Sequence, residues 1–292
     1  MHAFYLDSAF GGQRFCLHHE AQGALKRGQL LYIHPFAEEM NKSRRMAALQ
    51  SRALAQAGFE VLQIDLRGCG DSAGDFGDAT WTDWVDDALL GCRWLQSKPN
   101  PAPLWLCGLR SGGLVAAEAQ RRLESPAHLL LLQPPVSGKL MLQQFMRLKL
   151  ASEIVDGRAK SLMLELRATL DRGESIDIAG YTLSAALASG LEAATLVPLG
   201  LTIARRRLVW LELSSRPDAE WSPVALQAHQ RWRDAGYAVD CEFVSGPAFW
   251  STSEIEESPA LVEAVCRWLT SASTNDLPVS PTPRAMAAPL TP

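Results

Sequence analysis

The stretch LWLCGLRSGGLV, residues 104–115, decides the fold of this chain. Its first part, Leu104–Gly108, has the apolar composition of a buried strand, and the stretch Gly113–Leu123 has the spacing of a helix. Small residues between them permit a tight, strained turn that lifts one side chain above the edge of a sheet. The stretch therefore predicts a strand-turn-helix element of the kind that presents a catalytic nucleophile.

The turn fits the motif Gly-x-Ser-x-Gly at every defined position except the one that performs the chemistry. Aligned without gaps, Gly108 and Gly112 take the two glycine positions and Arg110 takes the position of the serine. Ser111 can take that position only if Leu109 replaces the first glycine, which puts a branched side chain where the backbone needs close approach. We predict Arg110 at the tip of the turn, with the shifted alignment as the alternative.

Short apolar runs alternate with longer helical stretches along the chain, which is typical of parallel strands joined by crossover helices. Phe4–Leu6 and Arg14–His18 indicate an antiparallel opening pair. The other predicted strands are Gln29–Ile33, Glu60–Asp65, Leu104–Gly108, His128–Gln133, Leu208–Leu213 and Val239–Val244, and the predicted helices are Ser43–Ala57, Trp81–Gln96, Gly113–Leu123, Pro223–Ala235 and Pro259–Leu269. The pattern predicts an α/β fold with about eight strands in a mostly parallel sheet.

One segment interrupts this alternation. About 70 residues separate the strand ending at Gln133 from the strand starting at Leu208, more than a crossover needs. Helical patterns at Met141–Ile154 and Ala159–Leu170, and a small-residue stretch at Tyr181–Ala194, predict an inserted helical cap. The predicted organisation is a core of residues 1–135 and 206–272, a cap of residues 136–205, and a disordered, proline-rich tail of residues 273–292.

Composition excludes several classes of partner. The formal net charge of -4 offers no basic excess for a nucleic acid or an anionic bilayer. No apolar run approaches the roughly 20 residues that span a membrane, and no signal peptide is apparent, so we expect a cytoplasmic protein. The six scattered cysteines form no C-x-x-C pair and indicate reduced core residues. No pattern indicates a metal site or another cofactor.

A second turn lies upstream of the first. Residues 65–72, DLRGCGDS, resemble the D-x-R-G-x-G-x-S turn that follows the fourth strand of many α/β-hydrolases. The preceding strand ends in His34-Pro35-Phe36, where these enzymes usually carry His-Gly and donate one amide to an oxyanion hole. Here the N–H of Phe36 is available for that role. Two such turns in this order predict an α/β-hydrolase fold with a helical cap insertion.

Two further stretches narrow the resemblance. Residues 35–46, PFAEEMNKSRRM, and residues 246–250, GPAFW, resemble the exosortase A system-associated hydrolase 2 family, over roughly residues 1–270. The resemblance implies a protein encoded beside bacterial exopolysaccharide and PEP-CTERM sorting genes. It implies a nominal ester or thioester hydrolase, or an acyltransferase, with a small-molecule, acyl or glycan ligand under the cap. It implies neither a substrate nor an oligomeric state.

The catalytic triad of this fold is incomplete. Its order is Ser, then Asp or Glu, then His after the last strand, but no histidine follows His229, which lies within a predicted helix. Asp218 or Glu212 can take the acid position, although without the histidine there is no base to orient. We therefore expect no acyl-enzyme chemistry. The alternative is a pseudo-hydrolase, a binding or scaffold protein for an anionic ligand or a partner of the exopolysaccharide pathway.

Arg110 itself indicates what surrounds it. The helix after the turn directs the positive end of its dipole at this cation, so a carboxylate must compensate. We expect Glu38, Glu39, Asp71 or Asp75 on loops beside the turn. Three interpretations stay open: an internal ion-pair network, a site for an external anion, and hydrolysis with Glu38 or Glu39 as base. The predicted catalytic positions are Arg110, Glu38, Glu39 and Asp218, and the predicted ligand-binding residues are His34, Phe36, Asn41, Lys42, Arg44, Asp71, Ser111, Gly112, Phe249 and Trp250.

Overall fold

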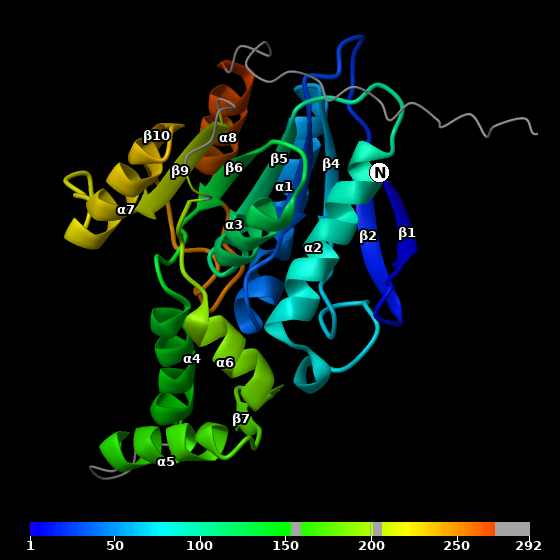
Figure 1. The fold of residues 1–292 in the computed structure, drawn as a ribbon. Helices are drawn as coiled ribbons and strands as arrows, with labels where there is room; N and C mark the ends of the chain where they lie inside the picture. The colour runs from blue at the N-terminus through cyan, green and yellow to red at the C-terminus, as the bar shows by residue number, and fades with distance from the viewer. Residues whose placement is uncertain (153–158, 199, 201–205, 272–292) are drawn as a thin grey trace, which may run out of the picture.

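The computed structural model describes residues 1–152, 159–198, 200 and 206–271, and within them eight strands form one sheet (Figure 1). The strand order is β1-β2-β4-β3-β5-β6-β9-β10. The strands are β1 (His2–Asp7), β2 (Gln13–His19), β3 (Gly28–Ile33), β4 (Phe59–Ile64), β5 (Leu104–Leu109), β6 (Ala127–Leu132), β9 (Arg206–Ser214) and β10 (Tyr237–Ser245). The pairs β1–β2 and β2–β4 are antiparallel and the others parallel, which confirms the predicted α/β class.

Helices cover both faces of this sheet (Figure 1). The helices α2 (Trp81–Gln96), α3 (Gly112–Arg122) and α7 (Pro223–Asp234) pack on one face, and α1 (Glu38–Gln56) and α8 (Pro259–Ser271) on the other. Side chains of β3 alternate between the two cores: Leu31 and Ile33 face the first, Leu30 and Tyr32 the second. Burial on both faces explains why the central strands are nearly continuous apolar runs.

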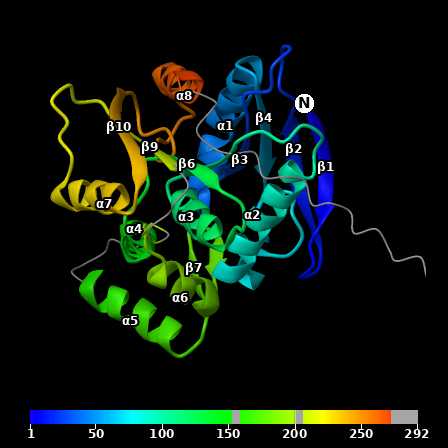
Figure 2. The same cartoon turned by 45° about the horizontal axis from the view of Figure 1, so that its top comes forward.

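The segment between β6 and β9 contains three helices and a small hairpin among its described residues. These are α4 (Gly138–Ser152), α5 (Ala159–Asp171), β7 (Ile176–Ile178), β8 (Tyr181–Leu183) and α6 (Ala185–Ala193). They lie together beyond one end of the sheet (Figures 1 and 2). We call this segment the insertion. Residues 153–158, 199 and 201–205 of the predicted cap, and the predicted tail of residues 273–292, lie outside the described residues.

Helix α1 begins five residues earlier than the sequence indicates. The sequence indicates a helix start at Ser43, but α1 starts at Glu38. The residue before it, Ala37, has a φ of 48°, which differs from the backbone of an extended strand. The Ser43 hydroxyl instead donates to the carbonyl of Glu39 within the helix, at 2.6 Å. Glu38 and Glu39 therefore stand in the first turn, where the helix dipole favours negative charge, and not on a loop as predicted.

None of the helices in the described part of the chain has both the length and the apolar character to cross a membrane.

Candidate functional site

The turn after β5 has the geometry of a nucleophile elbow, and Arg110 is at its tip. Arg110 has a φ of 53°, which is rare for a residue with a side chain and typical of strained functional turns. A Cβ at Gly108 would come within 2.3 Å of the Gly112 carbonyl oxygen, and one at Gly112 within 2.4 Å of the Ile33 carbonyl oxygen. Both glycines are required by this packing. The ungapped alignment predicted from sequence is therefore the observed one.

Ser111 follows the tip and cannot act as its nucleophile. It takes the N-cap position of α3 with ordinary helical backbone angles, and 2% of its surface is exposed. The alternative alignment, with Ser111 in the catalytic position, is wrong, since that position needs the strained turn occupied by Arg110. Gly112 serves the turn through its lack of a side chain.

The guanidinium of Arg110 lies against a carboxylate, as predicted. Its Nε is 3.2 and 3.3 Å from the two carboxylate oxygens of Glu39, and its Nη2 is 3.2 Å from the first of them. Nη2 also donates to the side-chain oxygen of Gln144 on α4, at 3.1 Å. The Arg110 and Glu39 side chains are 14% and 13% exposed. The elbow thus holds an ion pair with a link to the insertion.

An aromatic ring stands where a catalytic histidine is expected. Trp250 follows β10, the last strand, and its ring centroid is 5.5 Å from the Arg110 guanidinium carbon. That separation is within the range of a cation–π contact. The ring is buried and packs edge-to-face on Phe249, which is also buried. Trp250 has no basic atom, so it can hold a cation but cannot take a proton from a nucleophile.

The two glutamates at the start of α1 are held in an environment that disfavours their charge. Burial raises the pKa of Glu39 above its usual range, although Arg110 and Lys42 oppose the change. Burial also raises the pKa of Glu38, again opposed by Lys42 and Arg110. The Oε2 atom of Glu38 is buried and has no hydrogen-bond partner among the described residues. Both carboxyls are therefore easier to protonate than ordinary surface glutamates.

His34 does not serve the site, which corrects the prediction that it faces the ligand. Its Nε2 accepts the backbone N–H of Leu66 at 3.1 Å, so Nδ1 carries the proton and donates to the Pro35 carbonyl at 2.8 Å. Burial lowers the pKa of His34, which keeps the ring neutral. His34 therefore links the loop after β3 to the turn after β4 by a hydrogen bond.

Phe36 has a packing role in the structure. Its side chain is buried and contacts Phe145 of α4 edge-to-face, with ring centroids 4.7 Å apart. It also packs against Phe76, which contacts Tyr181 of the insertion hairpin. These rings join the loop after β3 to the insertion, so the side chain of Phe36 is occupied by protein contacts.

Three other predicted ligand-binding residues point to other partners. Asn41 donates to the hydroxyl of Tyr181 at 3.0 Å. Arg44 forms a bidentate pair with Asp65, at 3.0 and 2.9 Å, and the backbone N–H of Asp71 donates to that same carboxylate. Asp71 is exposed and is not the compensating carboxylate of Arg110, which is Glu39. The prediction that Asp71 could be the carboxylate that compensates Arg110 is therefore wrong.

Asp218 and Glu212 are the two residues predicted for the acid position of a triad, and neither has a catalytic histidine to orient. Asp218 is exposed in the turn after β9. Glu212, on β9, accepts the indole N–H of Trp210 at 3.0 Å. Burial raises the pKa of Glu212, and the positive charge of Arg110 opposes that rise. Glu212 therefore stands in the electrostatic field of the elbow, whereas Asp218 faces solvent.

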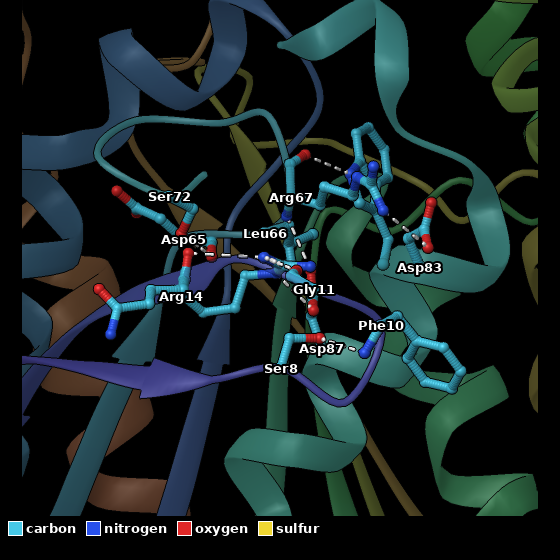
Figure 3. A network of polar contacts seen from close by, with 12 residues as sticks. Ser8, Phe10, Gly11, Arg14, Asp65, Leu66, Arg67, Ser72, Asp83 and Asp87 are labelled. Atoms are coloured by element: carbon cyan, nitrogen blue, oxygen red, sulfur yellow. Dashed lines mark hydrogen bonds and ion pairs between the residues drawn. The ribbon is translucent and has the colours of Figure 1, made fainter. Parts of the chain in front are cut away.

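The turn after β4 is fixed by a second ion pair (Figure 3). Arg14 of β2 donates from Nε to Asp87 of α2 at 2.6 Å, and the backbone N–H of Arg67 donates to the other oxygen at 2.7 Å. The hydroxyl of Ser72 donates to the Asp65 carbonyl at 2.5 Å. These hydrogen bonds hold the D-x-R-G-x-G-x-S stretch in place beside β2 and α2.

No group of three or more metal-ligating side chains occurs among residues 1–152, 159–198, 200 and 206–271.

The sequence does not predict the contact of Gln144 with Arg110 or that of Tyr181 with Asn41. Gln144 and Tyr181 both come from the insertion, far from the elbow along the chain, and a lone Gln or Tyr in a helical or hairpin pattern carries no signal of such a contact.

Comparisons with known proteins agree on the superfamily. A family model described as "Serine aminopeptidase, S33" matches residues 25–180, more than half of the chain. Human Protein ABHD12B is 31% identical over 128 residues, 42% of this chain and 33% of that protein. Lysophosphatidylserine lipase ABHD12 of Danio rerio is 31% identical over 112 residues, 37% of this chain and 28% of the lipase. The matched stretch thus spans about a third of these relatives or less.

Solved structures share the fold over nearly the whole chain. Est1E from Butyrivibrio proteoclasticus with ferulic acid bound superposes with a TM-score of 0.62 at 15% identity, covering 92% of this chain and 97% of that chain. Alpha/beta hydrolase domain-containing protein 10 from mouse gives a TM-score of 0.54 at 13% identity, covering 94% of this chain and 100% of that chain. At these identities the likeness concerns the fold alone.

Proposed function

The chain belongs to the serine aminopeptidase S33 family of α/β-hydrolases, and we propose that within it this chain binds an anionic group at the elbow in place of serine-hydrolase chemistry. The observation that carries the proposal is Arg110 at the strained tip, paired with Glu39. A guanidinium there cannot attack an acyl carbon. Trp250, with no basic atom, lies beside it.

The Arg110–Glu39 pair has the features of an exchangeable contact. Its three N–O distances, 3.2 to 3.3 Å, exceed the 2.7–2.9 Å that is usual for charge-assisted hydrogen bonds. Protonation of Glu39, favoured by its raised pKa, leaves Arg110 without its counter-charge. An external carboxylate or phosphate can then take the place of Glu39, supported by the positive end of α3.

The biological setting follows from the resemblance to exosortase A system-associated hydrolases. We propose that the ligand or partner comes from exopolysaccharide export or PEP-CTERM protein sorting. The insertion, as a cap over the elbow, would enclose a small acyl or glycan ligand.

A thermal-shift titration with acetate and inorganic phosphate tests the binding proposal, because a ligand of the native state raises Tm. Wild type should be stabilised, Arg110→Gln should not respond, and the matched control Arg172→Gln, at an exposed ion pair, should respond like wild type. A response that survives in Arg110→Gln contradicts the proposal.

A second candidate function has one observation in its favour. The raised pKa and unpartnered Oε2 of Glu38 suit a general base that activates water. A panel of p-nitrophenyl esters and acyl-CoA thioesters separates the candidates. Hydrolysis by wild type that is lost in Glu38→Gln supports the nominal ester or thioester hydrolase or acyltransferase, and no turnover supports the binding protein.

A further inference from the structure

Strand β1 is an open edge of the sheet. It pairs with β2 alone, and no helix of the described part of the chain lies beyond it (Figures 1 and 2). At the end of β1 the backbone N–H of Ser8 donates to the carbonyl of Gly12 at 3.0 Å, and peptide groups alternate in direction along a strand. The N–H and C=O groups of Ala3, Tyr5 and Asp7 therefore point away from β2 and have no partner in the described sheet.

A hydrogen bond on the other side of β2 confirms this orientation. The carbonyl of Phe15 accepts the backbone N–H of Asp65, just after β4, at 2.9 Å. Phe15 therefore directs its backbone groups toward β4. Its cross-strand partner on β1 is Tyr5, whose backbone groups consequently point outward.

The two edges of the sheet differ in how they are protected from pairing with another chain. Charged side chains and prolines usually oppose such pairing. The opposite edge, β10, carries Asp240 and Glu242, which accept hydrogen bonds from Arg207 and Arg267. Strand β1 has no proline, lysine or arginine, and its one carboxylate, Asp7, is its last residue. Strand β1 is therefore the less protected edge.

The side chains of β1 offer apolar surface on both faces of this edge. Tyr5 is 51% exposed and contacts Phe15 of β2, with ring centroids 5.5 Å apart. On the opposite face Phe4 and Leu6 are partly buried, and the ring of Phe4 is 4.8 Å from that of Trp94 on α2. A strand added at this edge would meet apolar side chains above and below the free backbone groups.

We propose that β1 binds β1 of a second copy of this chain, with the two strands antiparallel about a twofold axis at Tyr5. In this register Tyr5 lies opposite Tyr5 of the partner subunit, and Ala3 opposite Asp7 of the partner subunit. Every outward N–H then has a carbonyl partner. An axis at Phe4 or Leu6 would carry Asp7 or Ala3 beyond the end of the partner strand and leave its groups outside the pairing.

The same register brings compatible side chains together. Directly opposite residues of antiparallel strands share a face and lie about 5 Å apart. Phe4 meets Leu6 of the partner subunit on one face. On the other face, Phe15 and Tyr5 continue into Tyr5 and Phe15 of the partner subunit as one row of rings. The two Asp7 carboxylates stay about 13 Å apart along the strands, so like charges do not meet.

The area of the contact limits its strength. Strand β1 has six residues and is therefore about 20 Å long. Pairing of two such strands buries roughly 300–400 Å² per copy, about half of the roughly 800 Å² per partner in a standard stable interface. We therefore expect a reversible dimer that forms as the protein concentration rises, and not a permanent one.

Sedimentation equilibrium of the full chain over about 5 to 500 µM tests for this dimer. Wild type should move from monomer toward dimer across the range. Tyr5→Lys should stay monomeric, because it would place two lysines directly opposite each other at the axis. The matched control Phe10→Lys, at a 61% exposed aromatic residue in the turn after β1, should associate like wild type.

Engineered disulfides test the register. The Cα atoms of a hydrogen-bonded antiparallel pair are about 5.5 Å apart, within the range of a disulfide. Mild oxidation should therefore link two copies of Tyr5→Cys. Ala3→Cys lies on the same strand and face but should not link to itself, since its two copies would be about 13 Å apart along the strands. A mixture of Ala3→Cys and Asp7→Cys should link.

A protein that stays monomeric at every concentration overturns the proposal, and so does binding of an extended peptide at β1 by a chain that never dimerises. A dimer that persists in Tyr5→Lys places the interface elsewhere and also overturns it. If Tyr5→Lys fails to fold, the disulfides decide: equal linking of Tyr5→Cys and Ala3→Cys shows that the register is wrong. Anion binding at the elbow is a separate question, because β2, β4 and β3 lie between β1 and β5.

Discussion

Two arginine–carboxylate pairs in this molecule differ in their depth and their geometry. Arg14 and Asp87 are 1% and 2% exposed, with Nε and Oδ1 2.6 Å apart (Figure 3). Arg110 and Glu39 are 14% and 13% exposed, with Nη2 and Oε1 3.2 Å apart. The Asp87 carboxylate also accepts a backbone N–H, from Arg67, whereas Glu39 is held by Arg110 at longer distances.

The difference indicates that the Arg14–Asp87 pair has a structural role and that the Arg110–Glu39 pair belongs to the candidate site. The Arg14–Asp87 pair joins β2, α2 and the turn after β4 through two short hydrogen bonds, of 2.6 and 2.7 Å. The Arg110–Glu39 pair lies at the strained tip of the elbow and reaches into the insertion through Gln144, whereas burial raises the carboxyl pKa in both pairs, to about 6 for Asp87. A turn held by short hydrogen bonds thus lies next to a longer and more exposed ion pair, which fits the exchangeable anion site that we propose.

The largest effect is expected from breaking the buried pair. Asp87→Asn leaves the Arg14 guanidinium buried without its counter-charge, and such losses cost about 3–5 kcal/mol. Urea unfolding at neutral pH measures the change in the free energy of unfolding. The control Glu174→Gln, at an exposed pair with Arg172, should leave that free energy nearly unchanged. An equally stable Asp87→Asn protein would show that the buried network is not a support.

A smaller loss is expected at the elbow. Arg110→Gln removes a cation from a partly exposed pair and should cost roughly 1–2 kcal/mol, between the values for surface and buried pairs. The lost cation also raises the pKa of Glu39 further. A carboxyl with a raised folded pKa adds stability below its unfolded pKa and loses it as the pH rises through the folded value.

The deficit of Arg110→Gln relative to wild type should therefore be largest above the folded pKa of Glu39 and should shrink in acid. Unfolding measured across this pH range checks the sign. A deficit that grows as the pH falls would contradict the assigned role of Glu39.

The smallest effect is expected at the exposed acid position. Asp218→Asn should change neither stability nor anion binding, because Asp218 lies in a solvated turn. Glu212→Gln, at a carboxyl in the field of Arg110, is the matched comparison and should alter anion affinity measurably. Calorimetric titration with acetate measures both. A strong loss of binding in Asp218→Asn would place that carboxylate in the site.

The sequence predicts most of the fold, because buried parallel strands and their helices are local patterns. The eight strands, α2 and the elbow glycines follow from apolar runs, helical spacing and small residues at fixed offsets. The start of α1 is missed because it depends on a strained Ala37 and not on a capping side chain. The hairpin Ile176–Leu183 is missed because each of its strands has only three residues, too few to show an alternating pattern.

The site is predicted in part. Arg110 at the tip follows from the spacing of Gly108 and Gly112, and a compensating carboxylate follows from the helix dipole. The sequence cannot select Glu39 over Asp71, since that depends on where α1 begins. It also gives no sign of Gln144 or of the hydrogen bond from Leu66 to His34, because those contacts join segments that are distant along the chain.

The central claim is that Glu39 occupies the place of an external anion on Arg110. Calorimetric titration of wild type and Glu39→Gln with a short alkyl sulfonate, which stays charged at every pH used, tests it most directly. Removal of the competing carboxylate should raise the affinity by about tenfold or more, from hydrogen bonds to a charged group. Wild-type affinity should rise as the pH falls through the raised pKa of Glu39, and Glu39→Gln should lose that dependence. A Glu39→Gln variant that binds the sulfonate no more tightly than wild type, with an unchanged pH profile, would contradict the account.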